Sequence, residues 1–565
     1  LVERAHELGY KAIALTDECT YSGLVKAHVV AAKLGIKLIV GAEFAFKADQ
    51  RADRANEKLV LLAPTRNAYG QLSAFISALR RRAKKGSYDA EVKDFSFGLK
   101  ECFALWIPHQ RAIEQQVSLG QQLKTALPQL WLALELFHDG HDLDKTAHIL
   151  TLSSRLQVPI TAANNVHTHR PERQPLQDIV TAIRHKTTLQ NLGHRAFNNA
   201  ERTLRPLTKL TSIYPAELLN ESVHIAEQCH FNMDELRYEY PKDLVPPHLS
   251  APDYLRQLTF AGAAERWPSG IPADTLKLIE KELTLIGQLQ YEHYFLTVQD
   301  IVQFARGQNI LCQGRGSAAN SAVCYCLFIT EVDPARMHLL FERFVSMERN
   351  EPPDIDVDFE HERREEVIQY IYTRYGRDRA ALAATLVTYR PRSAIKDVGK
   401  ALGFDLDVLN LLAKSLAWWD KSQDVGERLR SIGIDPNSSK AKHFLHFINE
   451  ILGFPRHLSQ HVGGFVISSG PLTQLVPVEN AAMAERTVIQ WDKEDLEALG
   501  LLKVDVLALG MLTAIRKALD LCNADPSESE PLCVQNIPAE DPDTYSMLQQ
   551  GDSIGVFQVE SRAQM

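Results

Sequence analysis

Short apolar segments alternate with helical segments along roughly the first 170 residues. Each apolar segment has the length of a strand, and the stretches between them repeat apolar residues with the spacing of a helix face. This alternation favours a mostly parallel sheet, open or closed into a barrel, in which chemistry gathers at the carboxyl ends of the strands. Strands are expected at residues 11–16, 37–43, 58–62, 102–107, 130–137 and 158–163, with helices at 23–34 and 69–82.

The pattern changes several times in the rest of the chain, which at 565 residues is long enough for three to four domains. A mainly helical zone extends to about residue 310 and contains a clear amphipathic helix at 273–289. Turns, helices and one acidic strand are mixed over 311–387, and short helices follow over 390–455. Apolar strands return at 464–468 and 503–507, so the chain is expected to be a multidomain protein of α/β and α+β type.

The acidic strand carries the most informative pattern in the chain, three aspartates at alternating positions, Asp354, Asp356 and Asp358. In a strand these side chains share one face, and the apolar residues between them point to the other. Carboxylates gathered on one face repel each other and typically hold a divalent metal. Two alternatives stay open, a capping or solvated acid cluster and a calcium loop. Glu365 suits the loop, but Phe359 stands where that loop needs glycine.

Asp505 is the natural third metal ligand. It lies between Val504 and Val506 in an apolar strand and is expected to face away from both. A lone aspartate in such a strand is more often a paired structural acid. However, Lys503 shares its face by the period of two, which indicates a corner that holds metal and phosphate.

A glycine-rich cationic turn, Gly314–Ser317, stands about forty residues before the acidic strand and is expected to open an apolar helix. Backbone N–H groups at a helix N-terminus, with glycine permitting close approach, bind phosphate. The segment lacks the lysine of a P-loop and is therefore no Walker A motif. Arg315 and Arg343 could neutralise a triphosphate. The alternatives are a small-residue cap and a simple ion pair of Arg343 with a neighbouring acid.

The net charge of −9 argues at first against a nucleic-acid partner, but the charges are not evenly spread. Residues 351–366 are strongly acidic, and residues 371–400 are rich in Arg and Lys. An acidic pocket beside a basic ridge suits a metal-dependent enzyme that acts on a polyanion. Solvated helix faces and surface loops are the alternative. The candidate contacts to a DNA backbone are Arg390, Arg392, Lys396, His461 and Gly463.

Three further features bear on cellular context. The eight cysteines form no CxxC pair, which is typical of a reducing cytosol. No apolar run approaches the ~20 residues of a membrane span, so no membrane association is expected. The chain begins with Leu1 inside a helical pattern and ends abruptly at Met565, and is therefore interpreted as a fragment of a longer protein, expected to be cytoplasmic.

In its acidic strand, its glycine turn and several further motifs, the chain resembles the bacterial C-family DNA polymerases, the polymerase III alpha subunits. The resemblance covers essentially the whole chain and rests on ordered motifs at 314–317, 340–344, 353–359, 396–400, 461–464 and 503–505. The amino-acid sequences of residues 312–325, 358–364 and 388–393 resemble those of the error-prone, damage-inducible branch. Phe328 departs from the glycine that the family usually has at this position.

The resemblance implies which residues carry the chemistry. Asp356, Asp358 and Asp505 match the catalytic carboxylates that hold two Mg²⁺ ions, and Asp354 matches a motif acid outside that trio. The implied phosphate-binding groups are Arg315, Gly316, Ser317, Arg343 and Lys503. The implied substrates are primer–template DNA and deoxynucleoside triphosphates. A sliding clamp and translesion accessory proteins are implied as partners.

The resemblance also implies a domain order. Residues 1–225 would form a PHP domain, a βα-barrel whose N-terminal strand is missing. A palm of the polymerase-β-like nucleotidyltransferase type would comprise 226–387 and 461–521, with a mainly helical thumb at 388–460 inserted into it. Residues 522–545, rich in Pro, Ser, Glu and Asp, read as a linker, so 522–565 would be the linker and the start of the fingers.

The PHP site departs from the pattern of metal-binding PHP domains. Asp17, Glu43 and His167 match it, but Glu18 replaces a histidine and Asn165 stands where an acid is common. We therefore expect a degraded, structural site without bound metal and without nuclease activity.

The expected function is template-directed DNA synthesis, error-prone and part of DNA repair. A replicative alpha subunit, a PHP-type phosphoesterase and a non-catalytic DNA-binding scaffold are the alternatives. The fragment by itself is expected to be inactive, because the fingers are missing.

Overall fold

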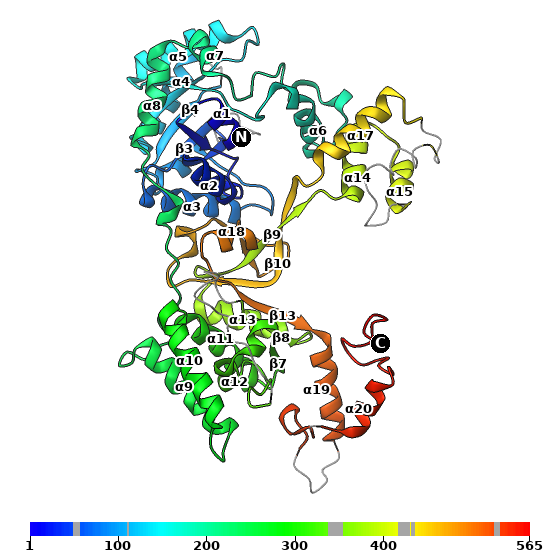
Figure 1. Ribbon diagram of the computed structural model, residues 1–565. Helices are drawn as coiled ribbons and strands as arrows, with labels where there is room; N and C mark the ends of the chain where they lie inside the picture. The colour runs from blue at the N-terminus through cyan, green and yellow to red at the C-terminus, as the bar shows by residue number, and fades with distance from the viewer. Residues whose placement is uncertain are drawn as a thin grey trace. The chain divides into compact units, whose positions relative to one another are not determined.

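The computed structural model of the protein describes residues 1–48, 57–109, 112–336, 354–415, 430, 435–524, 531–538 and 540–565 (Figure 1). The chain divides into two compact units. Unit 1 comprises Leu1–Arg237, Ala384–His461 and Leu472–Leu499, and unit 2 comprises Tyr238–Ala383, Val462–Pro471 and Gly500–Met565. Each unit is therefore built from segments that are far apart in the sequence.

The first part of unit 1 contains a six-stranded sheet whose order follows the sequence from β1 to β6. The six predicted strands are confirmed, as β1 (Ala12–Leu15), β2 (Lys37–Phe46), β3 (Glu57–Leu62), β4 (Phe103–Ile107), β5 (Leu130–Glu135) and β6 (Ile160–Ala163). Three of the pairings are parallel, as expected, but β3 is antiparallel to both neighbours. Among the described residues no pairing joins β1 to β6, so the barrel closure that was one of the two expectations is not observed there.

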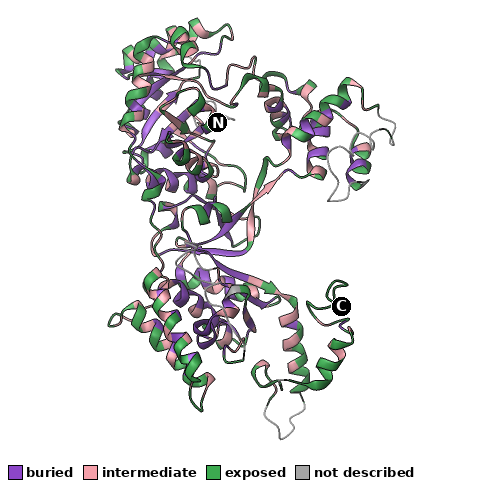
Figure 2. Ribbon diagram, viewed as in Figure 1, coloured by how far each residue is buried: buried purple, intermediate pink, exposed green. Residues whose placement is uncertain are grey.

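The helices of unit 1 pack apolar faces against this sheet. Both predicted helices are confirmed, as α2 (Leu24–Leu34) and α3 (Arg66–Arg81). Thr65 is the N-cap of α3, because its hydroxyl accepts a hydrogen bond from the backbone N–H of Ala68. Figure 2 shows buried residues along the strands and exposed residues on the outer helix faces. The other helices of this part are α1 (Val2–Glu7), α4 (Ile113–Ala126), α5 (Asp142–Leu156), α6 (Gln174–Arg184), α7 (Leu207–Ile213) and α8 (Ala216–Gln228).

A second core in unit 1 joins helices from distant parts of the chain. Helix α6 packs with α14 (Pro391–Ala401), α15 (Leu406–Ser415) and α17 (Ser439–Ile451) around Ile179, Ile395 and Phe444, which are fully buried. The short helices predicted over 390–455 are thus confirmed where this stretch is described. Unit 1 also contains the antiparallel strands β11 (Val478–Asn480) and β12 (Thr487–Ile489), followed by α18 (Lys493–Ala498).

The sheet of unit 2 has the strand order β9-β10-β13-β8-β7. The strands are β7 (Cys312–Arg315), β8 (Asp356–Glu360), β9 (Ala380–Thr388), β10 (Pro455–Ile467) and β13 (Val504–Leu509), and both β9 and β10 continue into unit 1. β8 and β13 are parallel, whereas β7 is antiparallel to β8 and β10 is antiparallel to β13. The two predicted apolar strands and the acidic strand are therefore confirmed.

Helices of unit 2 share one core with this sheet, which includes the fully buried Phe295, Ile368 and Val506. The predicted helix at 273–289 is confirmed as α10 (Ala273–Leu289). The others are α9 (Ala251–Arg266), α11 (Glu292–Gly307), α12 (Ala322–Cys326), α13 (Arg364–Tyr375), α19 (Gly510–Cys522) and α20 (Pro542–Gln549). No described helix combines the length and the apolar content that crossing a bilayer requires.

Candidate metal centre

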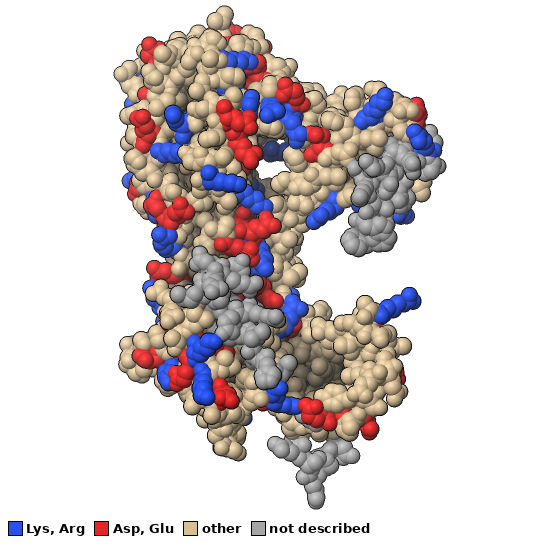
Figure 3. Space-filling model, in the orientation of Figure 1, with Lys and Arg blue, Asp and Glu red and all other residues tan. Residues whose placement is uncertain are grey.

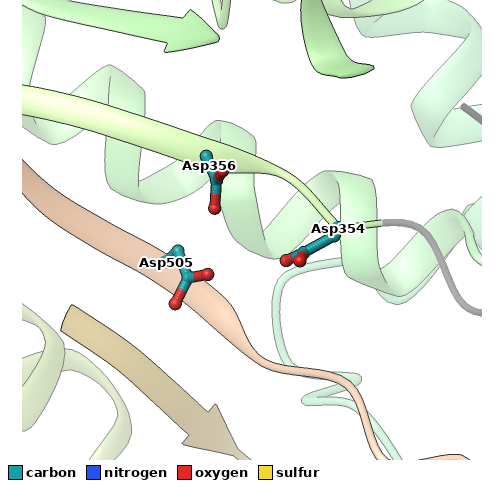
Figure 4. A group of neighbouring side chains, drawn as sticks. All are labelled: Asp354, Asp356 and Asp505. Carbon is teal, nitrogen blue, oxygen red and sulfur yellow. The ribbon is translucent and has the colours of Figure 1, made fainter. Parts of the chain in front are cut away.

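Two adjacent parallel strands bring distant carboxylates together. Asp505 on β13 is paired in register with Asp356 on β8. The flanking Val357, Val504 and Val506 are buried in the core, which leaves the other face of these strands to the carboxylates. Figure 4 shows Asp356 on β8, Asp505 on the adjacent β13, and Asp354 where the chain enters β8.

One group of acids in the described part of the chain could hold a metal ion, and it consists of Asp354, Asp356 and Asp505. One ligand atom from each residue lies within 4.8 Å of the others. Carboxylate oxygens gathered this closely are the ligands that Mg²⁺ and Ca²⁺ prefer. The predicted convergence of Asp356 and Asp505 is therefore observed.

Asp358, the third acid expected to bind metal, is not a member of this group. One of its carboxylate oxygens lies 3.4 Å from the guanidinium of Arg315, which is also 3.8 Å from Asp356. Contact with both acids places Asp356 and Asp358 on the same face of β8, as the period of two predicts. Asp358 thus lies beside the group and is paired with a cation.

The site has a strong effect on carboxylate ionisation. Burial, together with the neighbouring carboxylates of Asp505 and Asp354, raises the pKa of Asp356 to about 6. Burial also raises the pKa of Asp358, although Arg315 opposes that shift. Divalent cations would remove the repulsion that causes part of these shifts.

Lys503 lies within the carboxylate group. Its ammonium nitrogen Nζ is 3.0 Å from Asp354 and also contacts Asp505. Burial alone would lower the pKa of Lys503, but the two carboxylates outweigh it and the net shift is upward. The expectation that Lys503 and Asp505 share a face of the strand is confirmed.

The glycine turn at 314–317 differs from its predicted form. It does not open the apolar helix directly: Gly316–Asn320 forms a 3-10 helix, and α12 begins only at Ala322 with Ser321 as its N-cap. Gly316 has a φ of 61°, in the left-handed region that favours glycine. Gly314 lies against the carbonyl oxygen of Ile329, where any Cβ would clash. The small residues therefore allow a tight turn that leaves Arg315 beside the aspartates.

Two predicted phosphate-binding groups cannot be placed. Arg343 lies outside the described residues, together with the rest of its 340–344 motif. The backbone of Ser317 belongs to the 3-10 helix, but its side chain lies outside the description as well.

The candidate DNA contacts fall into two groups. Arg390, Arg392 and Lys396 are exposed on and beside the start of α14, and their side chains are accessible to a polyanion. Figure 3 shows that basic and acidic side chains are interspersed on the visible face. His461 is partly buried, and Gly463 is buried at a position where a Cβ would overlap the carbonyl oxygen of Val506 on β13. Close packing of two strands is thus a sufficient reason for glycine at 463.

Sequence reasoning missed two residues that hold the site together. The hydroxyl of Tyr294 accepts the N–H of Ile355 at 2.9 Å and donates to the carbonyl oxygen of Lys503 at 3.2 Å. The guanidinium of Arg364 donates to the carbonyl oxygens of Val506, at 2.8 Å, and Val462. Both are long-range contacts. In the sequence, a role for Arg364 is indicated by one feature, its place in a pair of arginines that follows the acidic strand.

Acidic side chains of the expected PHP site are paired with basic side chains. Glu43 pairs with Lys58 at 2.6 Å, Glu18 pairs with Arg184 at 2.6 Å, and Glu135 lies 3.9 Å from Arg202. The metal-binding candidates found in the described ranges include none of these acids.

The pKa values of the other two PHP residues, Asp17 and His167, are both shifted. Burial raises the pKa of Asp17. Burial and then Arg202 lower the pKa of His167 to about 4, and the imidazole lies 3.1 Å from the side chain of Asn165. A neutral imidazole of this kind could bind metal, but Glu43 and Glu18 have basic partners.

Family models assign the chain in three consecutive parts. The PHP domain matches residues 1–110, the bacterial DNA polymerase III alpha NTPase domain matches 253–508, and the bacterial DNA polymerase III alpha subunit finger domain matches 511–565. A PHP domain, an alpha-type NTPase domain and a finger domain in this order define the class of multidomain bacterial DNA polymerases.

Curated relatives give the same assignment over the entire chain. The relatives from Saccharophagus degradans, Methylococcus capsulatus and Teredinibacter turnerae, each named error-prone DNA polymerase, are 53%, 55% and 53% identical over 100% of this chain. The chain spans about half of their length, 54%, 53% and 54% respectively. The chain belongs to the DNA polymerase III alpha-subunit family, the bacterial C-family DNA polymerases.

Proposed function

We propose that this chain is the catalytic half of a template-directed DNA polymerase that adds deoxynucleotides to a primer 3′ end. The observation that carries the proposal is the register of Asp356 and Asp505 on adjacent parallel strands. That register gathers carboxylates from two distant segments at one point, which is what a two-metal phosphoryl-transfer site requires.

The residues present fit a metal centre. Asp356 and Asp505 would hold Mg²⁺. Asp358, two residues further along β8, would join them once Arg315 turns to the nucleotide. Bound metal would activate the primer hydroxyl and offset charge on the leaving pyrophosphate. Arg315 and Lys503, which neutralise the carboxylates here, would bind the triphosphate together with Arg343 and the backbone of Gly316 and Ser317.

Sequence information would come from base pairing, so the protein needs contacts to the DNA backbone only. Arg390, Arg392 and Lys396 are exposed and suit that role, and His461 and Gly463 stay in the proposal as weaker candidates. We infer that residues 1–225 form the PHP domain, 226–387 and 461–521 the palm, 388–460 the thumb, and 522–565 the linker and start of the fingers.

The names of the relatives support the error-prone branch. We propose that the polymerase is a bacterial, cytoplasmic enzyme of the damage response. A replicative alpha subunit is the alternative within the family. A sliding clamp and translesion accessory proteins are the proposed partners. The PHP-type phosphoesterase is a weaker candidate, because Glu18 and Glu43 are paired with Arg184 and Lys58. A scaffold without catalytic activity does not account for the gathered carboxylates.

The proposal is tested by primer extension with the full-length polymerase, meaning this chain within a protein of the relatives' length. Asp356→Asn and Asp505→Ala are expected to abolish incorporation and to leave DNA affinity close to that of wild type. Asp274→Asn is the matched control, since the Asp274 side chain is 98% exposed. Near-normal incorporation by Asp356→Asn would refute the assignment.

A template with an abasic site tests the branch. Extension past the lesion supports the error-prone assignment, and arrest at the lesion with normal extension on intact template supports the replicative one.

A further inference from the structure

The ammonium of Lys503 stands between two carboxylates of different character. It lies 3.0 Å from Oδ1 of Asp354 on one side and contacts Oδ2 of Asp505 on the other. The Asp354 side chain is 42% exposed and precedes β8, whereas the Asp505 side chain is 5% exposed and lies within β13. Lys503 therefore connects the solvent-facing carboxylate of Asp354 to the buried carboxylate of Asp505.

The backbone at both ends of the Asp354–Lys503 pair is fixed by one buried group. Tyr294, which is fully buried, accepts the N–H of Ile355 and donates to the carbonyl oxygen of Lys503. Ile355 directly follows Asp354. Since a single hydroxyl ties the two segments, the distance between Asp354 and Lys503 is set by the core and not by a surface loop.

Metal binding would change the surroundings of this lysine. A divalent cation on Asp505 and the ammonium of Lys503 are like charges, and they cannot share the same carboxylate oxygens without strong repulsion. A desolvated ammonium that loses its carboxylate also loses the interaction that offsets its burial. Asp354 also contacts the Lys503 ammonium, and it can keep that contact when Asp505 binds metal.

Asp354 is less suited to be a metal ligand than the acids in the strands. Asp358 and Asp505, each with a 5% exposed side chain, are held by the β8 and β13 ladders. Catalytic ligands need such rigid support. Asp354 lies before the first residue of β8 and is therefore outside the ladder that holds Asp358 and Asp505.

We propose that Asp354 is a positioning residue that keeps the Lys503 side chain directed at the triphosphate of the incoming nucleotide while Asp505 binds metal. Asp354 acts through Lys503 and does not itself touch the reacting atoms. The inference rests on the proposed polymerase function and adds to it a specific role in nucleotide binding.

Single-nucleotide incorporation by the full-length polymerase tests this role. Asp354→Asn is expected to raise the KM for the nucleotide about tenfold, with kcat within about threefold of wild type and an unchanged Mg²⁺ dependence. Lys503→Ala should show the same kind of defect. The double variant should be no worse than Lys503→Ala alone, because residues that act through one another are not additive. Asp354→Glu should keep most of the wild-type KM, and Asp274→Asn controls for loss of a surface charge.

Three results would overturn the inference. Loss of turnover in Asp354→Asn equal to that in Asp356→Asn, or a changed Mg²⁺ dependence, would make Asp354 a metal ligand. Additive defects in the double variant would show that Asp354 and Lys503 act separately. A wild-type KM in Asp354→Asn would exclude any role. A wild-type enzyme that incorporates no nucleotide would instead contradict the proposed function, and the inference with it.

Discussion

Asp505 lies directly opposite Asp356, on the neighbouring parallel strand. Parallel pairing places side chains of paired residues on the same face of a sheet, so the two carboxylates approach each other without help from flexible loops. The cations Lys503 and Arg315 lie against these carboxylates and offset part of the resulting repulsion. The register of the two strands thus determines which carboxylates meet.

Binding of Mg²⁺ should stabilise the protein through these carboxylates. A ligand that binds the folded state alone raises the melting temperature, so millimolar Mg²⁺ should raise that of the wild-type chain. Asp356→Asn should remove most of the Mg²⁺-dependent increase, because it removes one charged ligand. Differential scanning fluorimetry with and without EDTA measures the effect, and Asp274→Asn should retain it. An equal Mg²⁺ effect in Asp356→Asn would place the metal elsewhere.

Gly463 is expected to be required for stability. An added Cβ would overlap the carbonyl oxygen of Val506, so Gly463→Ala must push β10 away from β13. Overpacking of this kind costs about 1–3 kcal/mol of unfolding free energy. Gly470→Ala is the matched control, since no atom lies within 4 Å of its added Cβ. Urea denaturation measures both. A Gly463→Ala variant with normal stability and weakened DNA binding would favour a direct contact with DNA.

Lys58 should stabilise the region around Glu43 in unit 1. Lys58→Ala leaves Glu43, whose side chain is 16% exposed, without the ammonium that lies 2.6 Å away. A largely buried carboxylate without its partner is costly, so a loss of about 1–3 kcal/mol is expected in urea denaturation. Lys93→Ala removes a more exposed surface pair with Glu91 and should cost about 0–1 kcal/mol. Equal effects of the two substitutions would contradict a structural role for the Glu43–Lys58 pair.

Asp495 should make unit 1 sensitive to pH. Burial, with the nearby Asp492 adding to it, raises the pKa of Asp495 to about 7. An acid whose pKa is raised by folding binds its proton more tightly when folded, so it lowers stability as pH rises from about 4 to 7. Asp495→Asn lacks this titration and can still accept the N–H of Asp492.

The melting temperature of Asp495→Asn should therefore exceed that of wild type increasingly between pH 5 and 7, and the difference should level off above about pH 7. Lys26 faces Asp492 at 3.6 Å, and Lys26→Met should enlarge the pH effect by removing a compensating cation. A difference between wild type and Asp495→Asn that does not change with pH would contradict the raised pKa.

The sequence by itself determined the local structure around the site. Alternation of Asp356 and Asp358 with apolar residues specified a strand with one acidic face, because side chains alternate along every strand. The valines around Asp505 specified a second buried strand in the same way. Resemblance in short motifs then indicated the family, which the family models and the relatives confirm.

Only the tertiary structure decided which acids meet. Register between β8 and β13 depends on contacts across the core, such as the Tyr294 hydroxyl between Ile355 and Lys503, and these leave no periodic trace in the sequence. For that reason Asp354, expected to be outside the metal trio, lies in the carboxylate group, and Asp358 lies beside Arg315. The pairing of Glu18 with Arg184, 166 residues away, was equally invisible, because charges at such separation meet only through the packing of the whole domain.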